Sequence, residues 1–90
     1  MATQANTQGR DVKLEDTGWI PVVSSNVAAI RFVRRAVTGG FLLVRFKDGG
    51  GGAYSDVSRG VFTRMLNSPS KGKFVHRVLK DRYPYRAGGV

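Results

Sequence analysis

The stretch from Phe41 to Val57, FLLVRFKDGGGGAYSDV, decides the fold. Its first seven residues alternate between the two sides of an extended chain. One side carries only apolar residues: Leu42, Val44 and Phe46. The other side mixes apolar and basic residues: Phe41, Leu43, Arg45 and Lys47. Four glycines follow Asp48, and because glycine reaches positive φ angles without a Cβ clash, the chain can reverse there. The stretch therefore predicts the central hairpin of a small sheet, with a return strand that starts at Ala53.

The segment before this hairpin predicts a second strand with the same two-sided character. In Val27 to Arg35, VAAIRFVRR, the apolar Ile30 and Phe32 alternate with other residues, and Gly39-Gly40 supplies the turn into Phe41. Paired antiparallel, the two strands share one apolar face. The opposite face carries these residues: Arg31, Arg35, Arg45, Lys47, Phe41 and Leu43. Such a face is either an ordinary solvent-exposed side of a sheet or a basic platform on which single-stranded nucleic acid stacks.

After Ser58 the apolar residues change to a helical spacing. Ser58 is a helix N-cap, and the helix it starts ends at Asn67-Ser68-Pro69, since proline cannot continue a helix. Ser70 caps a second helix. The apolar positions of the first helix are Val61, Phe62, Met65 and Leu66, and those of the second are Phe74, Val75, Val78 and Leu79. Together these patterns predict an α+β fold, in which a small antiparallel three-stranded sheet, a hairpin meander, is followed by two helices packed on one face.

The second helix also carries a row of basic side chains. Lys73, Arg77 and Lys80 stand at i, i+4 and i+7 on its polar side, and Lys71 precedes them in the capping turn. A row of this kind is commonly a solvated face. Because almost no acidic residue neutralises it here, contact with phosphates is the alternative.

Ninety residues are enough for one domain. Residues 1–16 are polar and lack a period that would bury a face, which predicts a flexible N-terminal arm or a short strand added to some neighbour. The single domain is expected over residues 17–84, with Trp19 packed over one end of its core, and residues 85–90 form a loose basic tail.

The charge is strongly positive and unevenly distributed. Fifteen Lys and Arg stand against six Asp and Glu, a net charge of +9. Residues 1–57 carry seven basic and five acidic side chains, whereas residues 58–90 carry eight basic and one acidic, which is 8 − 1 = +7. A concentrated positive field attracts polyanions, of which nucleic acid is the commonest in a cell. An acidic protein surface and simple solubility are the alternatives.

Several classes of site are disfavoured by composition. The chain has no cysteine, which excludes disulfides, thiolate metal sites and thiol nucleophiles. The single histidine, His76, has no obvious acidic partner, so neither an enzyme, a metal site nor a cofactor is expected. The longest apolar runs are too short to cross a bilayer, and the first residues lack the apolar region of a signal peptide. We therefore expect no membrane partner and a cytoplasmic location, or a virion-associated one if the protein is encoded by a phage.

Five short motifs, in order, resemble the KTSC domain, a small domain found at the C-terminus of some lysyl-tRNA synthetases and alone in bacterial and phage proteins. They are VVSSNVAAIRF, LLVRFKDG, the segment Tyr54 to Val57, VFTRMLNSPSKGKF and Tyr83, so the resemblance covers roughly residues 20–83. Residue by residue, the matches are Ser24-Ser25, Gly49, Tyr54, Ser70, Gly72 and Phe74. Gly52 stands where the family has the first tyrosine of a Y-x-Y motif, and Ser58 replaces a proline. The resemblance implies RNA or other nucleic-acid binding.

Two hypotheses for the function follow. The first is a small non-catalytic nucleic-acid-binding module that contacts RNA, or nucleic acid non-specifically, through the phosphate backbone. Its binding residues are predicted to be Lys71, Lys73, Arg77, Lys80, Arg31, Arg35, Arg45, Lys47 and Tyr54. The second is a structural or interaction subunit with protein partners, such as a small phage virion or assembly protein.

Overall fold

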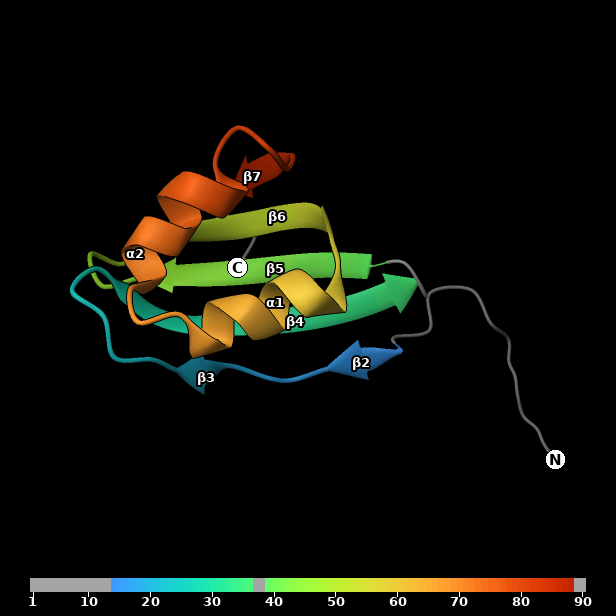
Figure 1. Ribbon diagram of the computed structural model, residues 1–90, viewed down its shortest axis with the longest axis horizontal. Helices are drawn as coiled ribbons and strands as arrows, with labels where there is room; N and C mark the ends of the chain where they lie inside the picture. The colour runs from blue at the N-terminus through green and yellow to red at the C-terminus, as the bar shows by residue number, and fades with distance from the viewer. Residues whose placement is uncertain (1–13, 37–38, 89–90) are drawn as a thin grey trace, which may run out of the picture.

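The computed structural model describes residues 14–36 and 39–88, which form one antiparallel sheet and a helical layer (Figure 1). The strands are β2 (Glu15–Asp16), β3 (Ile20–Pro21), β4 (Val27–Ala36), β5 (Gly39–Phe46), β6 (Gly51–Val57) and β7 (Tyr85–Ala87). The helices are α1 (Arg59–Asn67), α2 (Lys71–Phe74) and the π-helical turn η1 (Val75–Leu79). The sheet has the order β2-β4-β5-β6-β7, and β3 also pairs with β4.

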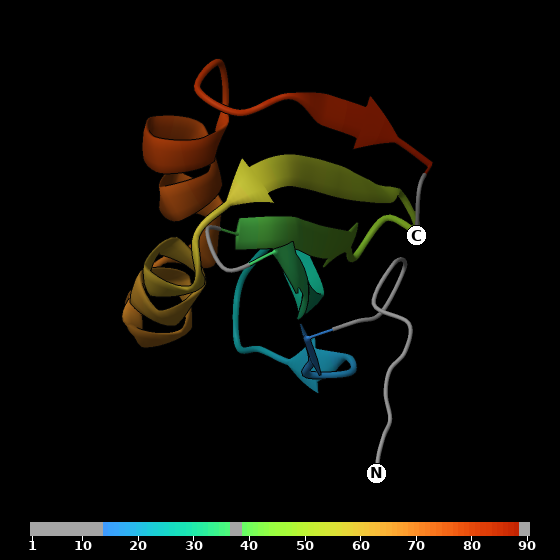
Figure 2. The ribbon, with the colours of Figure 1, turned by 90° about the vertical axis from the view of Figure 1, so that its right-hand side faces the viewer.

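The helices lie on one side of the sheet, and the core fills the space between them (Figure 2). The predicted apolar face is confirmed, because Ile30, Phe32, Leu42 and Val44 are fully buried. They sit in cross-strand pairs, Ile30 opposite Val44 and Phe32 opposite Leu42. From α1, the ring of Phe62 stacks on Phe32 with a centroid distance of 5.1 Å. This aromatic pair joins the helical layer to the centre of the sheet.

Both predicted N-caps are confirmed. The Ser58 hydroxyl accepts a hydrogen bond from the Val61 N–H at 3.2 Å, and the Ser70 hydroxyl accepts one from the Lys73 N–H at 3.3 Å. The second helix differs from the expected α-helix beyond Phe74. The Lys80 N–H donates to the Val75 carbonyl at 2.7 Å, five residues earlier, so the chain makes a wider π-type turn.

The prediction of a three-stranded sheet is wrong, since the sheet formed by residues 14–36 and 39–88 has six strands. The additional strands β2, β3 and β7 contain two, two and three residues, too few to show a period of two in the sequence. Residues 15 and 16, placed in the flexible arm, pair with Arg34 and Val33. Residues 85–87, placed in the loose tail, pair with β6. Residues 1–13 of the predicted arm and 89–90 of the tail lie outside the described residues.

Candidate functional site

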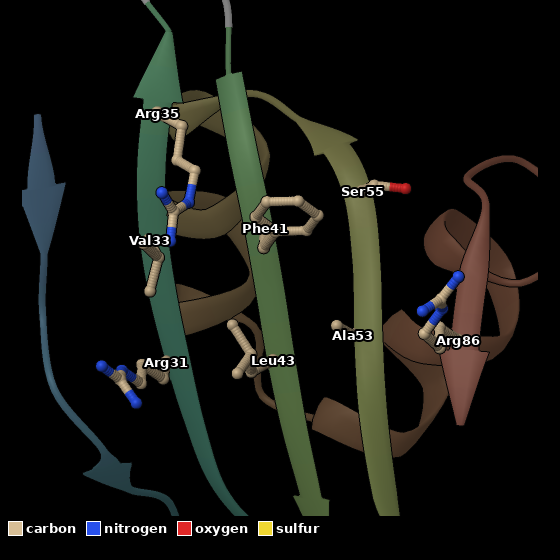
Figure 3. Close-up of a pocket in the computed structure, with 8 residues that line it drawn as sticks. All are labelled: Arg31, Val33, Arg35, Phe41, Leu43, Ala53, Ser55 and Arg86. Carbon is tan, nitrogen blue, oxygen red and sulfur yellow. The ribbon is translucent and has the colours of Figure 1, made fainter. Parts of the chain in front are cut away.

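The side of the sheet that faces away from the helices forms a shallow groove of about 660 Å³, shown in Figure 3. We call this side the open face. Its groove is lined by Arg31, Val33, Arg35, Phe41, Leu43, Ala53, Ser55 and Arg86. These side chains come from four neighbouring strands, β4 to β7, so the groove runs across the sheet. The strand register puts them on one side, because Val33 pairs with Phe41, Leu43 with Ala53, and Ala53 with Arg86.

The groove has an apolar floor with cations at both sides. Phe41 and Leu43 lie in the middle, and Phe41 remains 38% exposed. Arg31 and Arg35 lie over β4 on one side, whereas Arg86 lies over β7 on the other (Figure 3). An exposed aromatic ring between guanidinium groups can stack on a planar group while the arginines bind its negative charges.

The arginines of the open face differ in their partners. Arg31 makes a two-point ion pair with Asp16 of β2, with 2.9 Å from Nε to Oδ1 and 2.5 Å from Nη2 to Oδ2. Hydrogen bonding to Asp16 raises the pKa of the Arg31 guanidinium. Desolvation, a smaller effect, lowers it. Within residues 14–36 and 39–88, no carboxylate makes an ion pair with Arg35 or Arg86. The guanidinium groups of these two arginines are therefore not engaged by a carboxylate of the described residues.

Arg45 lies further along β5 and stacks on the tryptophan. Its guanidinium carbon is 4.1 Å from the centroid of the Trp19 ring, a cation–π contact. Trp19 was expected to pack over the core, whereas the structure places it against this surface arginine. The contact places a second aromatic ring against an arginine of the open face.

A smaller hollow of about 560 Å³ adjoins the groove and shares Arg35 and Phe41 with it. Its other lining residues are Ala36, Gly39, Gly40 and Asp56. The Asp56 carboxylate would repel a negatively charged ligand at this end. An anion is therefore better accommodated in the larger groove, between Arg35 and Arg86.

The predicted basic row of the second helix is a separate surface. Lys73, Arg77 and Lys80 are exposed and belong to the segment of α2 and η1. Figure 2 shows this helical layer on one side of the sheet, and the groove lies on the other side. Because η1 is a π-turn, the expected spacing of an α-helix does not hold beyond Val75. Lys71 has an internal role: its Nζ donates to the carbonyls of Leu66 and Ser68, at 3.1 and 2.5 Å, and caps the end of α1.

Three predicted residues of the sheet do not line the groove: Arg45, Lys47 and Tyr54. Tyr54 is only 6% exposed and belongs to the core, so the structure does not bring it together with the groove residues. Tyr54 pairs with Leu42, so it faces the helices, whereas its neighbours Ala53 and Ser55 face the groove. Lys47 is exposed in the turn after β5, where its N–H donates to the Asn26 carbonyl at 2.9 Å.

The buried position of Tyr54 predicts a loss of stability in alkali. Burial raises the pKa of its phenol above the ordinary value of 10.0, and Tyr85 and Asp81 add to this effect. In the unfolded chain the phenol ionises near its ordinary pKa, while the folded chain retains the proton to higher pH. The free energy of unfolding therefore falls as pH rises above about 10.

Guanidinium chloride unfolding on both sides of that pH would measure the effect. Tyr54→Phe should decline less steeply than the native chain, since phenylalanine has no proton to lose. An equally steep decline in the variant would attribute the loss to other groups.

Sequence reasoning missed three residues of the groove: Ala53, Ser55 and Arg86. The alternation along the strand indicates that Ala53 and Ser55 share one face of the sheet and that Tyr54 lies on the other. It does not say which face is the open one, because that depends on the register of the hairpin. Arg86 had no signal beyond its positive charge, because a strand of three residues is too short to show a period.

The described part of the chain shows no metal-binding group of three or more His, Asp or Glu side chains. None of the helices in the same residues is long and apolar enough to span a membrane.

Comparison with known proteins identifies the family. A family model described as the KTSC domain matches residues 23–83. The chain belongs to the KTSC domain family. A crystal structure of a KTSC domain protein from Yersinia pestis is similar to it, with 25% sequence identity and a TM-score of 0.68. The match covers 79% of this chain and 96% of that one. A search of curated proteins found no match.

The match to the KTSC domain confirms the resemblance seen in the sequence. The matched region includes some strands of the sheet and leaves others outside. The central strands β4, β5 and β6 lie inside residues 23–83, whereas β2, β3 and β7 lie outside. The outer strands nevertheless carry Asp16, which holds Arg31, and Arg86, which lines the groove. The groove of this KTSC domain is therefore completed by segments on both sides of the matched region.

Proposed function

We propose that this KTSC domain is a non-catalytic module that binds single-stranded nucleic acid, RNA in particular, across its open face. The observation that carries the proposal is the position of Arg35 and Arg86 on either side of the exposed Phe41 ring. Guanidinium groups bind phosphates through paired hydrogen bonds, and an aromatic ring on a sheet stacks on an unpaired base. In a duplex the base faces are already stacked on one another, so Phe41 favours single strands.

The size of the groove suits a short segment of a strand. From β4 to β7 there are three strand spacings of about 4.8 Å, so Arg35 and Arg86 stand on strands about 14 Å apart. Ser55 is the neutral polar side chain among the groove residues, which leaves few groups to read base edges. The domain would accordingly recognise the single-stranded state and the phosphate charge of the nucleic acid more than its base sequence.

Binding of this kind requires no catalytic residues. In the described chain the groove residues include no histidine and no carboxylate, the usual groups for proton transfer. We therefore propose binding without a chemical step and without a cofactor.

The test is a fluorescence-anisotropy titration with single-stranded RNA, single-stranded DNA, duplex DNA and an acidic peptide. With three arginine–phosphate contacts, from Arg35, Arg86 and the neighbouring Arg45, the logarithm of the binding constant should fall with slope about −2 against the logarithm of salt concentration. Affinity for the single strands should then drop about 20-fold between about 50 and about 200 mM salt. Equal affinity for the acidic peptide, or binding that salt does not weaken, would contradict the proposal and favour a structural subunit with protein partners.

A further inference from the structure

The C-terminal strand β7 packs so closely against Gly52 of β6 that a side chain at this position would clash with it. Gly52 is buried in β6, and a Cβ atom built on it would lie 2.4 Å from the Tyr85 hydroxyl oxygen and 2.5 Å from Cζ. The same Cβ would lie 2.6 Å from the backbone carbonyl oxygen of Arg86. Because one of these contacts is backbone, rotation of the Tyr85 side chain alone would not relieve the clash. The absence of a side chain at Gly52 is therefore a condition for β7 to lie where it does.

Further contacts hold β7 to β6. The Ser55 N–H donates to the Pro84 carbonyl at 2.9 Å, and the Gly88 N–H donates to the Gly51 carbonyl at 2.8 Å. The rings of Tyr54 and Tyr85 lie 4.6 Å apart, centroid to centroid, on the helical side of the sheet. The alternation of the strand then directs Arg86, the next residue, to the opposite side and into the groove.

The position of β7 decides whether the groove has cations at one side or two. Among the groove arginines, Arg31 and Arg35 belong to β4, inside the region matched by the KTSC model. Arg86 is the groove arginine outside it. With β7 displaced, the described groove would keep positive charge over β4 alone.

We propose that β7 is an affinity and specificity element of this chain, in which the Gly52–Tyr85 contact positions Arg86 to bind a second phosphate of a single strand. This inference rests on the proposed function and assigns the strand beyond the KTSC match to the same site. Gly52 and Tyr85 are positioning residues, and Arg86 is the residue that contacts the ligand.

The test is a double-mutant cycle with single-stranded RNA as the probe, using Arg86→Gln, Gly52→Ala and the combined variant. Arg86→Gln should weaken binding about 10-fold and reduce the magnitude of the salt slope by about 0.7, the loss of one phosphate contact. Gly52→Ala should have nearly the same effect although it retains the arginine. The combined variant should bind no more weakly than the weaker single variant, because both remove one interaction. Arg77→Gln, on the helical side, is the charge-matched control and should change the affinity less than about twofold.

Amide hydrogen exchange separates displacement of β7 from unfolding. In Gly52→Ala the amides of Ser55 and Gly88, which donate to the chain across the β6–β7 pair, should exchange faster, while those of β4 and β5 stay protected. Tyr85→Ala should also displace β7 and speed the exchange of the same amides, although it adds no side chain at residue 52.

The outcomes distinguish this inference from the proposed function. If the native chain binds RNA but both Arg86→Gln and Gly52→Ala bind within about twofold of it, β7 is not part of the site and the proposed function stands. Independent, additive effects of the two substitutions would overturn the positioning role of Gly52. Failure of the native chain to bind RNA would overturn the proposed function together with this inference.

Discussion

Reversing two charges on the open face, by Arg35→Glu and Arg45→Glu together, should weaken binding of single-stranded RNA at least about 100-fold. Each charge-assisted hydrogen bond to a phosphate is worth about 1.5–3 kcal/mol, and about 1.4 kcal/mol corresponds to a factor of ten in affinity. The new carboxylates would also repel the phosphates that the arginines attracted. Both side chains are exposed, so the fold should remain intact, as circular dichroism and thermal unfolding would verify.

The matched control is Lys73→Glu with Arg77→Glu, which changes the net charge by the same amount on the helical side. If the open face is the site, this variant should lose less than about fivefold, through weaker long-range attraction alone. Equal losses in the two variants would mean that binding follows net charge and no particular face. A large loss of RNA affinity in the control variant alone would indicate that the binding site lies on the helices.

Phe62→Ala should lower the free energy of unfolding by about 3–5 kcal/mol, the usual cost of removing a fully buried aromatic side chain. For a chain of 90 residues the whole free energy of unfolding is expected to be about 5–13 kcal/mol. The substitution removes the ring that stacks on Phe32 and leaves a cavity between α1 and the sheet. Guanidinium chloride unfolding would measure the change.

Phe41→Ala makes the same chemical change on the opposite side of the sheet. Its ring is 38% exposed, so the cost in stability should stay below about 1 kcal/mol. Its cost in RNA affinity should be larger, about 1–3 kcal/mol for one stacked base. Similar stability losses for Phe62→Ala and Phe41→Ala would contradict the assignment of the two faces.

The long strands and the helix starts were predictable because their signals span enough residues. Strands β4 and β5 have 10 and 8 residues, so their alternation separates Phe32 and Leu42 from Arg31 and Leu43. Each N-cap serine stands directly before its helix. The basic and aromatic character of the open face followed from the same alternation.

The remaining parts depend on contacts between segments far apart in the sequence. Strands of two or three residues, such as β2 and β7, form because a longer neighbour offers hydrogen bonds, which no local pattern reveals. The side of Tyr54 depends on its pairing with Leu42, and the four glycines of the hairpin left that register undetermined. The π-turn in η1 likewise gives no signal in the spacing of Val75, Val78 and Leu79.

The alternation in β4 and β5 makes the core and the groove depend on a single property, the strand register. Arg31 and Phe32 are chain neighbours on opposite sides of one sheet, so a slip of one residue would move the arginine into the core and the phenylalanine into the groove. Substitutions at groove positions can therefore change the surface of the groove while the core is preserved. An insertion or deletion that shifted this register between Arg31 and Phe32 would instead disrupt both the core and the groove, so we expect related chains to vary in length at their loops and ends.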